Sequence, residues 1–164
     1  MERDEKVDLY LQQAETVAAA AAGNAEAQYR VARGCVLCPD VYSGRDAAMW
    51  LQRAAASCHA KACYHLGRAY RYEDNLFNGI VEKDFEKANS YFKLAFDGFA
   101  KQSALGDVNS KVWLASMCRF GYGTTRDDEY AERLVAKAAE EGCTIAKELV
   151  AKGGVKNFLE LAHV

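Results

Sequence analysis

Apolar residues recur along this chain at the i, i+3, i+4, i+7 spacing of helices that bury one face. Three segments carry such a stripe. Its members are Ala47, Trp50, Ala54 and Ala55 in the first segment, Ala88, Tyr91 and Ala95 in the second, and Tyr130, Ala131, Leu134 and Ala138 in the third. Small residues let two helices approach closely, while an aromatic residue or a leucine fills the gap. The pattern predicts pairs of closely packed helices.

A second pattern repeats together with these stripes. Gly23, Cys58, Gly106 and Gly142 each stand eight residues before the apolar part of a short motif. The motifs read VARGC (31–35), LGRAY (66–70), LASMC (114–118) and VAK (150–152), and the leading positions are separated by 35, 48 and 36 residues. Self-similarity at such a period indicates stacked supersecondary units, none of which buries its apolar face alone. The single proline of the chain favours helix almost everywhere.

Glycines and capping residues set the expected helix ends. In the third unit, Gly106 and Asp107 begin a helix over 108–120, which the segment Gly121-Tyr122-Gly123 ends. The stretch TTRDD then offers N-caps for a second helix, which Gly142 stops. Compared with this third unit, the second unit has about five extra residues in the loop 71–84. Its second helix has about seven extra residues, which amount to two helical turns.

We therefore expect one all-α domain, residues 1–164, with about three helical repeats between terminal capping helices. The N-terminal cap is 1–22, the repeats are 23–57, 58–105 and 106–141, and the C-terminal caps are 142–164. Terminal units of a helical stack must cover an open apolar face. For the last segment the alternative to capping is a dimer contact through Phe158, Leu159 and Leu161.

The motifs of the second and third units are similar to a known repeat. LGRAY is followed by GIVEKDFEKANSYF, and a run leads from Leu114 through GYGTTRDDEYAERLVAKAAEEG. These segments resemble the Sel-one-like repeat family, a branch of the tetratricopeptide-like α-solenoids, while AQYRVARGC and RDAAMWLQRAAASC of the first unit match less well. The resemblance covers about residues 23–152. It implies a right-handed superhelix, an α-solenoid of antiparallel helix pairs, that acts as an adaptor in protein complexes.

Composition changes this picture little. The chain has 164 residues, of which 51% are hydrophobic and 27% charged, and its net charge is −2. These values argue against a disordered chain and against a protein that coats polyanions. The first residues, MERDEKVDLY, are charged where a secretory signal is apolar, and the alanine run 18–22 is too short to span a bilayer. We expect a soluble, cytoplasmic protein with a protein or peptide partner, and no role at nucleic acids or membranes.

Six cysteines raise the question of a metal site. Cys35-x2-Cys38 and Cys58-x4-Cys63 resemble a four-thiolate zinc site, but the repeats place the two pairs at opposite ends of a helix, about 20 Å apart. Cys35 and Cys118 occupy a core position of their repeats, so we expect reduced, packed thiols and no metal or cofactor. Cys58 replaces the glycine that ends a helix. Because the left-handed backbone is costly without glycine, we expect a different local turn there.

No arrangement of catalytic residues stands out in the sequence. His59 and His65 are six residues apart, a spacing that points two helical side chains away from one another. GYGTT lacks the lysine and the preceding strand of a phosphate-binding loop. Acidic pairs such as Glu140-Glu141 stand at helix ends, where carboxylates act as caps or solvated groups. We therefore expect a protein that is not an enzyme and has no small-molecule substrate.

The concave face is the leading candidate for a binding surface. In solenoids of this class it is lined by exposed positions of the first helix of each pair. These positions hold Tyr29, Arg33 and Val36, then Tyr64, Arg68 and Arg71, then Val112, Ser116 and Arg119. The expected contact residues are Tyr29, Arg33, Tyr64, Arg68, Arg71 and Arg119, because arginine pairs with carboxylates and tyrosine anchors interfaces. The leading hypothesis is an adaptor that grips an acidic or carboxylate-terminated segment; the alternative is that these positions are solvated and the tyrosines partly core.

The loop 71–84 supports a second hypothesis, a small inhibitor or immunity-type protein that blocks a partner enzyme. Its candidate contacts are Tyr72, Leu76 and Phe77, apolar residues on an otherwise polar loop. Such loop tips are costly unless covered, so they often mark contact sites. The alternative is that the loop folds back on the lengthened helix of its own repeat.

Overall fold

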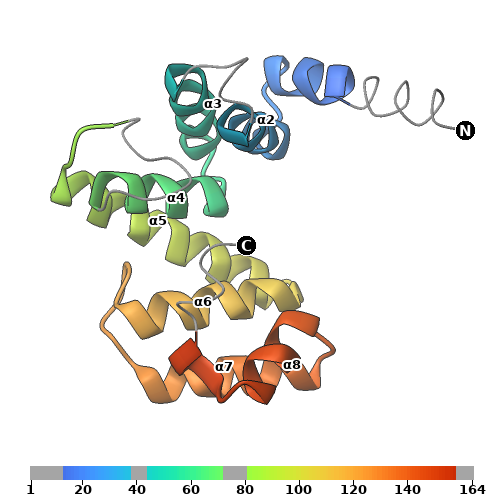
Figure 1. Ribbon diagram of the computed structural model, residues 1–164, viewed down its shortest axis with the longest axis vertical. Coiled ribbons are helices and arrows are strands. Elements are labelled where there is room, and N and C mark those ends of the chain that lie inside the picture. The colour runs from blue at the N-terminus through green and yellow to red at the C-terminus, as the bar shows by residue number, and fades with distance from the viewer. Residues whose placement is uncertain (1–12, 38–43, 72–80, 158–164) are drawn as a thin grey trace, which may run out of the picture. The chain divides into compact units, whose positions relative to one another are not determined.

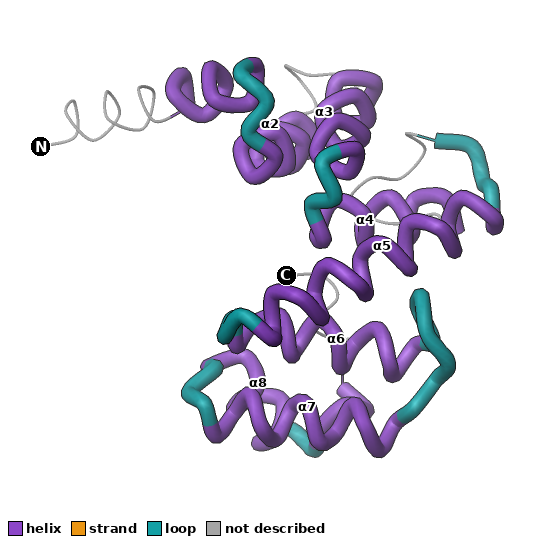
Figure 2. Tube along the Cα trace, turned by 180° about the vertical axis from the view of Figure 1, so that it is seen from behind, coloured by secondary structure: helices purple, strands orange, loops and turns teal. Residues whose placement is uncertain are grey.

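The computed structural model describes residues 13–37, 44–71 and 81–157, and every regular element in these ranges is helical (Figures 1 and 2). Residues 13–21 form the first described helix. The elements that follow are α2 (Ala25–Leu37), α3 (Gly44–Ala56), α4 (Ala60–Arg71), α5 (Phe85–Ala104), α6 (Val108–Phe120), α7 (Asp128–Glu140), α8 (Thr144–Ala151) and the 3-10 helix η1 (Gly154–Asn157).

The helices form two compact units, residues 1–88 and 89–164, and the boundary between them lies within α5. In the first unit α2 packs on α3 and α3 on α4. In the second unit α6 packs on α7, α7 on α8, and η1 lies against α7 and α8 (Figure 1). This packing of each helix on the next is that of an α-solenoid, as the sequence predicts.

The small residues of the predicted stripes form the core. The stripe alanines that are fully buried are Ala47, Ala54, Ala88, Ala95, Ala131 and Ala138. Among the larger members, Leu134 is buried, but Tyr130 is 41% exposed, because it lies one position to the side of the stripe that Ala131 continues. On α5, Phe92 and Phe99 are fully buried, which stabilises the fold by about 1.5–3 kcal/mol for each ring.

Helix lengths follow the repeat arithmetic. α6 runs from Val108 to Phe120, the range that the sequence predicts. α5 has 20 residues, whereas the equivalent helices α3 and α7 have 13 each, so the predicted insertion of seven residues is confirmed. Most of the loop 71–84 lies outside the described residues, as do Phe158, Leu159 and Leu161.

The same turn recurs at all four repeat boundaries. Gly23, Gly106 and Gly142 have φ angles of 97°, 97° and 98°, and Cys58 has a φ of 57°. At Cys58 the N–H donates to the Ala55 carbonyl (2.9 Å) and the next N–H donates to the Ala54 carbonyl (3.1 Å). These are the two hydrogen bonds of a Schellman C-cap. The expectation of a different turn at Cys58 is wrong, because the capping bonds hold the left-handed geometry without glycine.

A glycine is needed where the loop after α6 crosses α5. Tyr122 stacks on Phe92 with ring centroids 4.3 Å apart, which brings the loop backbone close to the helix. Gly123 has a φ of 69°, and a Cβ atom there would lie 2.4 Å from the Phe92 carbonyl oxygen. No side chain fits in that space, so this contact requires glycine.

Candidate functional site

The predicted contact tyrosines lie inside the first unit. Tyr29 on α2 and Tyr64 on α4 are each only 4% exposed. Their burial corresponds to the alternative in which the tyrosines belong to the core. Arg33 on α2 is exposed, while Arg68 and Arg71 on α4 are partly exposed. The arginines therefore remain accessible around a buried aromatic centre.

Two histidines complete that centre. The Tyr29 ring stacks on His59, with centroids 4.9 Å apart, and on His65, at 5.8 Å. Tyr64 meets the edge of His65 at 5.6 Å. We call Tyr29, His59, Tyr64 and His65 the aromatic cluster. It joins α2 to α4 and to the residue that precedes α4.

His59 is the N-cap of α4. Its carbonyl accepts the first helical hydrogen bond, from the N–H of Cys63 (3.0 Å), and its Nδ1 accepts the N–H of Ala62 (3.2 Å). Since Nδ1 is an acceptor, the proton of the neutral ring lies on Nε2, which donates to the Glu26 carboxylate (2.8 Å). Both ring nitrogens are thus engaged, and His59 cannot act as a general base without uncapping α4.

His65 lies in a positive electrostatic environment. Burial, followed by the charges of Arg68, Arg33 and Lys61, and then by His59, lowers its pKa to about 3. Burial raises the pKa of the Tyr29 hydroxyl, which the charge of Arg33 lowers and that of Glu26 raises. We call Arg33, Lys61 and Arg68 the cationic face. The charges of these three cations, from two helices, all act on His65, whose imidazole is uncharged at neutral pH.

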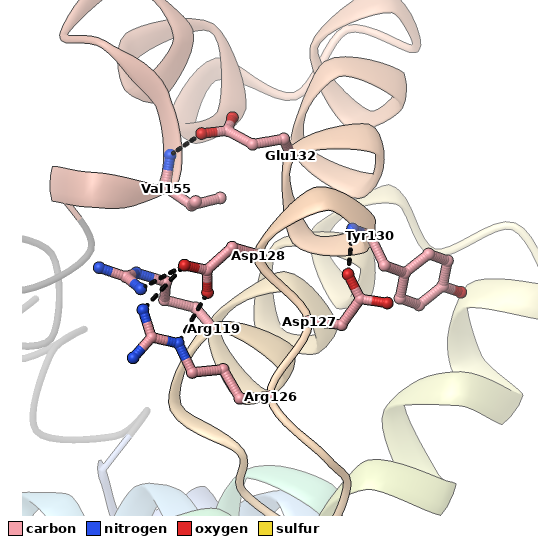
Figure 3. Close-up of polar contacts among 7 residues, drawn as sticks. All are labelled: Arg119, Arg126, Asp127, Asp128, Tyr130, Glu132 and Val155. Atoms are coloured by element: carbon pink, nitrogen blue, oxygen red, sulfur yellow. Dashed lines mark hydrogen bonds and ion pairs between the residues drawn. The ribbon is translucent and has the colours of Figure 1, made fainter.

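The cation of the third repeat is engaged within its own unit. Arg119 donates to the Asp128 carboxylate at 2.7 Å, and Arg126 donates to the same carboxylate at 2.8 and 3.0 Å (Figure 3). These hydrogen bonds, that of Arg126 first, hold the pKa of Asp128 well below its usual range. Asp127 caps α7 by accepting the Tyr130 N–H (2.8 Å), which fixes the neighbouring carboxylate in place. Arg119 is therefore a structural contact of α6 with α7 here.

The remaining predicted positions are dispersed. Val112 is buried, whereas Val36 and Ser116 are partly exposed. The loop contacts Tyr72, Leu76 and Phe77 lie outside the described residues. The structure thus brings Tyr29, Arg33, Tyr64 and Arg68 together in the first unit, with Arg71 at the end of α4.

The two histidines are not evident as site residues from the sequence, because their spacing suggests that both lie on one helix. His59 precedes α4 and is oriented by capping, so the six-residue spacing does not separate the rings. The alignment of the repeats indicates that His59 is an N-cap. His59 is aligned with Asn24 and Asp107, which follow Gly23 and Gly106 and are both N-caps in the structure.

Of the five described cysteines, Cys35, Cys63, Cys118 and Cys143 are buried and Cys58 is exposed. Cys35 and Cys118 are 3% and 2% exposed, which confirms their predicted core positions. Cys63 is fully buried; burial raises the pKa of its thiol to about 12, and the thiol donates to the Ala55 carbonyl at 3.8 Å. Cys38 lies outside the described residues. Within the described ranges, no group of three or more His, Cys, Asp or Glu side chains is placed to hold a metal ion.

Successive helix pairs, the recurring Schellman turn and the alanine-lined core define an α-helical repeat protein. The Sel1 repeat model matches residues 25–57, 60–98 and 109–143, which together cover more than half of the chain. The chain belongs to the Sel1 repeat family, and the resemblance seen in its motifs is confirmed. Members of this family are generally scaffolds for protein–protein interaction.

One solved structure agrees on the fold. A Sel1 repeat protein from Oxalobacter formigenes superposes with a TM-score of 0.51 at 24% identity, over 82% of this chain and 92% of that one. The antigen c5321 of uropathogenic Escherichia coli strains, which displays an SLR fold, gives a TM-score of 0.41 at 21% identity, over 82% of this chain and 34% of that one. No curated protein sequence matches the chain. None of the helices in the described ranges is long and apolar enough to cross a membrane.

Proposed function

We propose that this protein is a non-catalytic interaction scaffold whose first unit holds an acidic segment of a partner protein against the cationic face. The observation that carries the proposal is the convergence of Arg33, Lys61 and Arg68 around His65. All the charged groups that act on His65 are cations. An anionic partner would lower the electrostatic energy of this arrangement, whereas a cationic partner would raise it.

The contrast with the second unit supports the first unit as the binding surface. The chain as a whole carries a net charge of −2, so its cations must be concentrated for a positive surface to form. In the second unit Ser116 occupies the position equivalent to Arg33 and Arg68, and Arg119, the equivalent of Arg71, is satisfied by Asp128. The Asp128 carboxylate competes for Arg119 with any carboxylate of a partner, which disfavours binding of the partner there. The first unit carries an arginine at both equivalent positions, Arg33 on α2 and Arg68 on α4.

The chemistry of the guanidinium group supports a carboxylate as the ligand of the cationic face. Guanidinium groups offer planar pairs of N–H donors that match a carboxylate, and such charge-assisted hydrogen bonds are stronger than neutral ones. A hydrogen bond to a charged group contributes about 1.5–3 kcal/mol, so removing both arginines should weaken binding at least tenfold.

The test uses a defined acidic probe. A fluorescently labelled peptide of eight glutamates is titrated with the protein at pH 7.5 and its anisotropy is followed, with the eight-glutamine peptide as the neutral reference. The glutamate peptide should bind and the glutamine peptide should not. The double variant Arg33→Ala/Arg68→Ala should lose at least tenfold in affinity with nearly unchanged thermal stability. The matched control is Arg53→Ala, an exposed arginine of the same unit that lies over Trp50 on α3 (4.9 Å).

Two results would count against the proposal. Equal affinity of the wild-type protein and the double variant would remove the cationic face from recognition. A second variant, with the loop 71–84 shortened to the length of the third repeat, addresses the inhibitor hypothesis. If that variant alone loses the probe while it stays folded, recognition belongs to the loop.

A further inference from the structure

The last repeat, which contains α8, exposes an apolar surface that the second and third repeats bury. Counted from the repeat boundaries, Val150 on α8 is aligned with Leu66 on α4 and with Leu114 on α6. Leu66 and Leu114 are 0% and 5% exposed, whereas Val150 is 52% exposed. The next position shows the same contrast, because Ala151 is exposed and the aligned Ala115 is fully buried. In the described part of the chain, α8 therefore leaves one apolar face open.

We propose that this face is a second interaction site, which seats one amphipathic helix of a partner protein. The partner helix takes the place that the second helix of a repeat occupies. It presents a stripe of alanine and leucine to Val150 and an acidic side chain to Arg133. The site lies on α7 and α8, apart from the cationic face on α2 and α4, and it does not rest on the function proposed above.

A groove between α7 and α8 marks the place for this helix. Its volume is about 430 Å³. The residues that line it are Glu132, Arg133 and Ala136 on α7, Val150 on α8, and Gly153 and Gly154 after α8. Ala136 is exposed, as Val150 is. Because the lining includes an alanine and two glycines, another helix can approach it closely.

The third repeat shows what covers a face of this kind. Its second helix, α7, packs on α6, the helix that carries the buried Leu114. The buried side chains of α7 are Ala131, Leu134, Val135 and Ala138. In the described part of the chain α8 is followed by η1, which has four residues and is too short to take the place of such a helix. A helix with an alanine and leucine stripe is therefore the occupant that fits the open face of α8.

The charge on the neighbouring face of α8 argues against a stacked second copy of the chain. Glu148 is exposed, whereas the aligned residues Tyr29, Tyr64 and Val112 are buried. At Tyr29 this position faces the following repeat, because its ring stacks on His65 of α4. A further repeat stacked on α8 would bury the Glu148 carboxylate, which is costly without a partner group. The surface suits a single helix on the Val150 side instead.

The two charged residues of the groove differ in their contacts. The Glu132 carboxylate accepts the N–H of Val155 at 3.1 Å and so holds η1 against α7 (Figure 3). Arg133 is exposed, and its guanidinium lies over the Tyr130 ring, 5.5 Å from the centroid. A guanidinium that stacks through its face keeps the N–H donors at its edge for a carboxylate. Arg133 can therefore pair with an acidic side chain beside the apolar stripe of the partner helix.

The probe for this site is a peptide with the sequence of residues 128–140, the second helix of the third repeat. A hydrocarbon bridge on its polar face keeps it helical, because a free helix of this length is marginal in water. The peptide is titrated into the isotopically labelled protein at pH 7.5 and followed by NMR. Saturable shifts of backbone amides should be largest around Ala136, Val150 and Gly153 and small in α2 and α4. The same peptide with Leu134→Asp should bind at least about tenfold more weakly, since its apolar stripe is interrupted.

Two variants of the protein form a matched pair. Val150→Asp places a charge in the groove and should weaken the bridged peptide at least about tenfold. Ile145→Asp places the same charge on a different face of α8, at a position where Ile145 is 42% exposed and the aligned Asn109 is exposed too. It should leave the affinity unchanged. Both variants should keep the thermal midpoint of the wild-type protein, because both positions are exposed.

Three results would overturn the proposal. The first is the absence of saturable shifts, or an equal weakening by Val150→Asp and Ile145→Asp. The second is a wild-type chain that sediments as a dimer and a Val150→Asp variant that sediments as a monomer, because the face then joins two copies of this chain. The third is a thermal midpoint that Val150→Asp alone lowers, because the chain then covers this face itself. Failure of the glutamate peptide to bind refutes the cationic face and leaves this site untouched.

Discussion

Replacement of Cys58 by glycine should stabilise the protein. Cys58 has a φ of 57° at the position where the other three repeat boundaries carry glycine, with φ near 97°. A left-handed backbone costs about 1–2 kcal/mol in a residue with a Cβ atom. Glycine removes this cost and keeps both hydrogen bonds of the turn, since they use only backbone atoms.

The net gain is smaller than the relieved strain. Glycine loses more backbone entropy on folding than other residues, which costs about 0.5–1 kcal/mol. The Cys58 side chain is exposed, so little burial is lost. The free energy of unfolding should therefore rise by about 0.5–1 kcal/mol. For a chain of this size 1 kcal/mol corresponds to a shift of about 2–4 °C, so the thermal midpoint should rise by about 1–4 °C.

The assay is thermal unfolding followed by circular dichroism at pH 7.5 with a reductant present. The reciprocal change, Gly106→Cys, is the matched control, because the repeat register aligns the two positions and nothing lies within 4 Å of a Cβ atom at Gly106. It should lower the midpoint by a similar amount or more. A lower midpoint for Cys58→Gly, or an unchanged midpoint for Gly106→Cys, would refute the reasoning from backbone strain.

Two other changes test the packing of the second unit by urea unfolding. Gly123→Ala should lower the free energy of unfolding by at least about 2 kcal/mol, because the Cβ atom would meet the backbone of Phe92 at 2.4 Å. Gly142→Ala has an equally unfavourable φ but open space around the Cβ atom, so it should lower the free energy of unfolding by about 1 kcal/mol. Equal losses for the two variants would contradict the close contact. Glu141→Ala should lower the free energy of unfolding by about 1.5–3 kcal/mol, because the buried Lys111 ammonium loses its half-exposed carboxylate partner at 2.5 Å. Lys111→Met should lower it less, and the reverse order would contradict the dependence of Lys111 on this carboxylate.

Much of the fold follows from local signals in the sequence. Glycine ends helices for backbone reasons that do not depend on the surroundings, so the bounds of α6 could be predicted. The extra length of α5 followed from counting between repeats, since each unit has the same helix pair. The alanine stripes identified the buried faces because small residues are what close helix packing demands.

The candidate site could be predicted only in part. The repeat register places Tyr29 and Tyr64 on one side of their helices, but it does not show whether solvent or another helix covers that side. In the structure the rings of His59 and His65 lie against these tyrosines. The engagement of Arg119 by Asp128 depends on the path of the chain after α6, which helical spacing does not describe. At Cys58 the turn is set by hydrogen bonds that outweigh the local preference of the residue.

The most direct test of the scaffold proposal is an NMR titration of the isotopically labelled protein with the eight-glutamate peptide at pH 7.5. The proposal predicts saturable shifts of backbone amides in α2 and α4, largest around Arg33 and Arg68, with little change in α6 and α7, where Asp128 already engages Arg119. Saturable shifts confined to the second unit, or no saturable shifts with this peptide, would contradict the claim that the cationic face binds acidic segments.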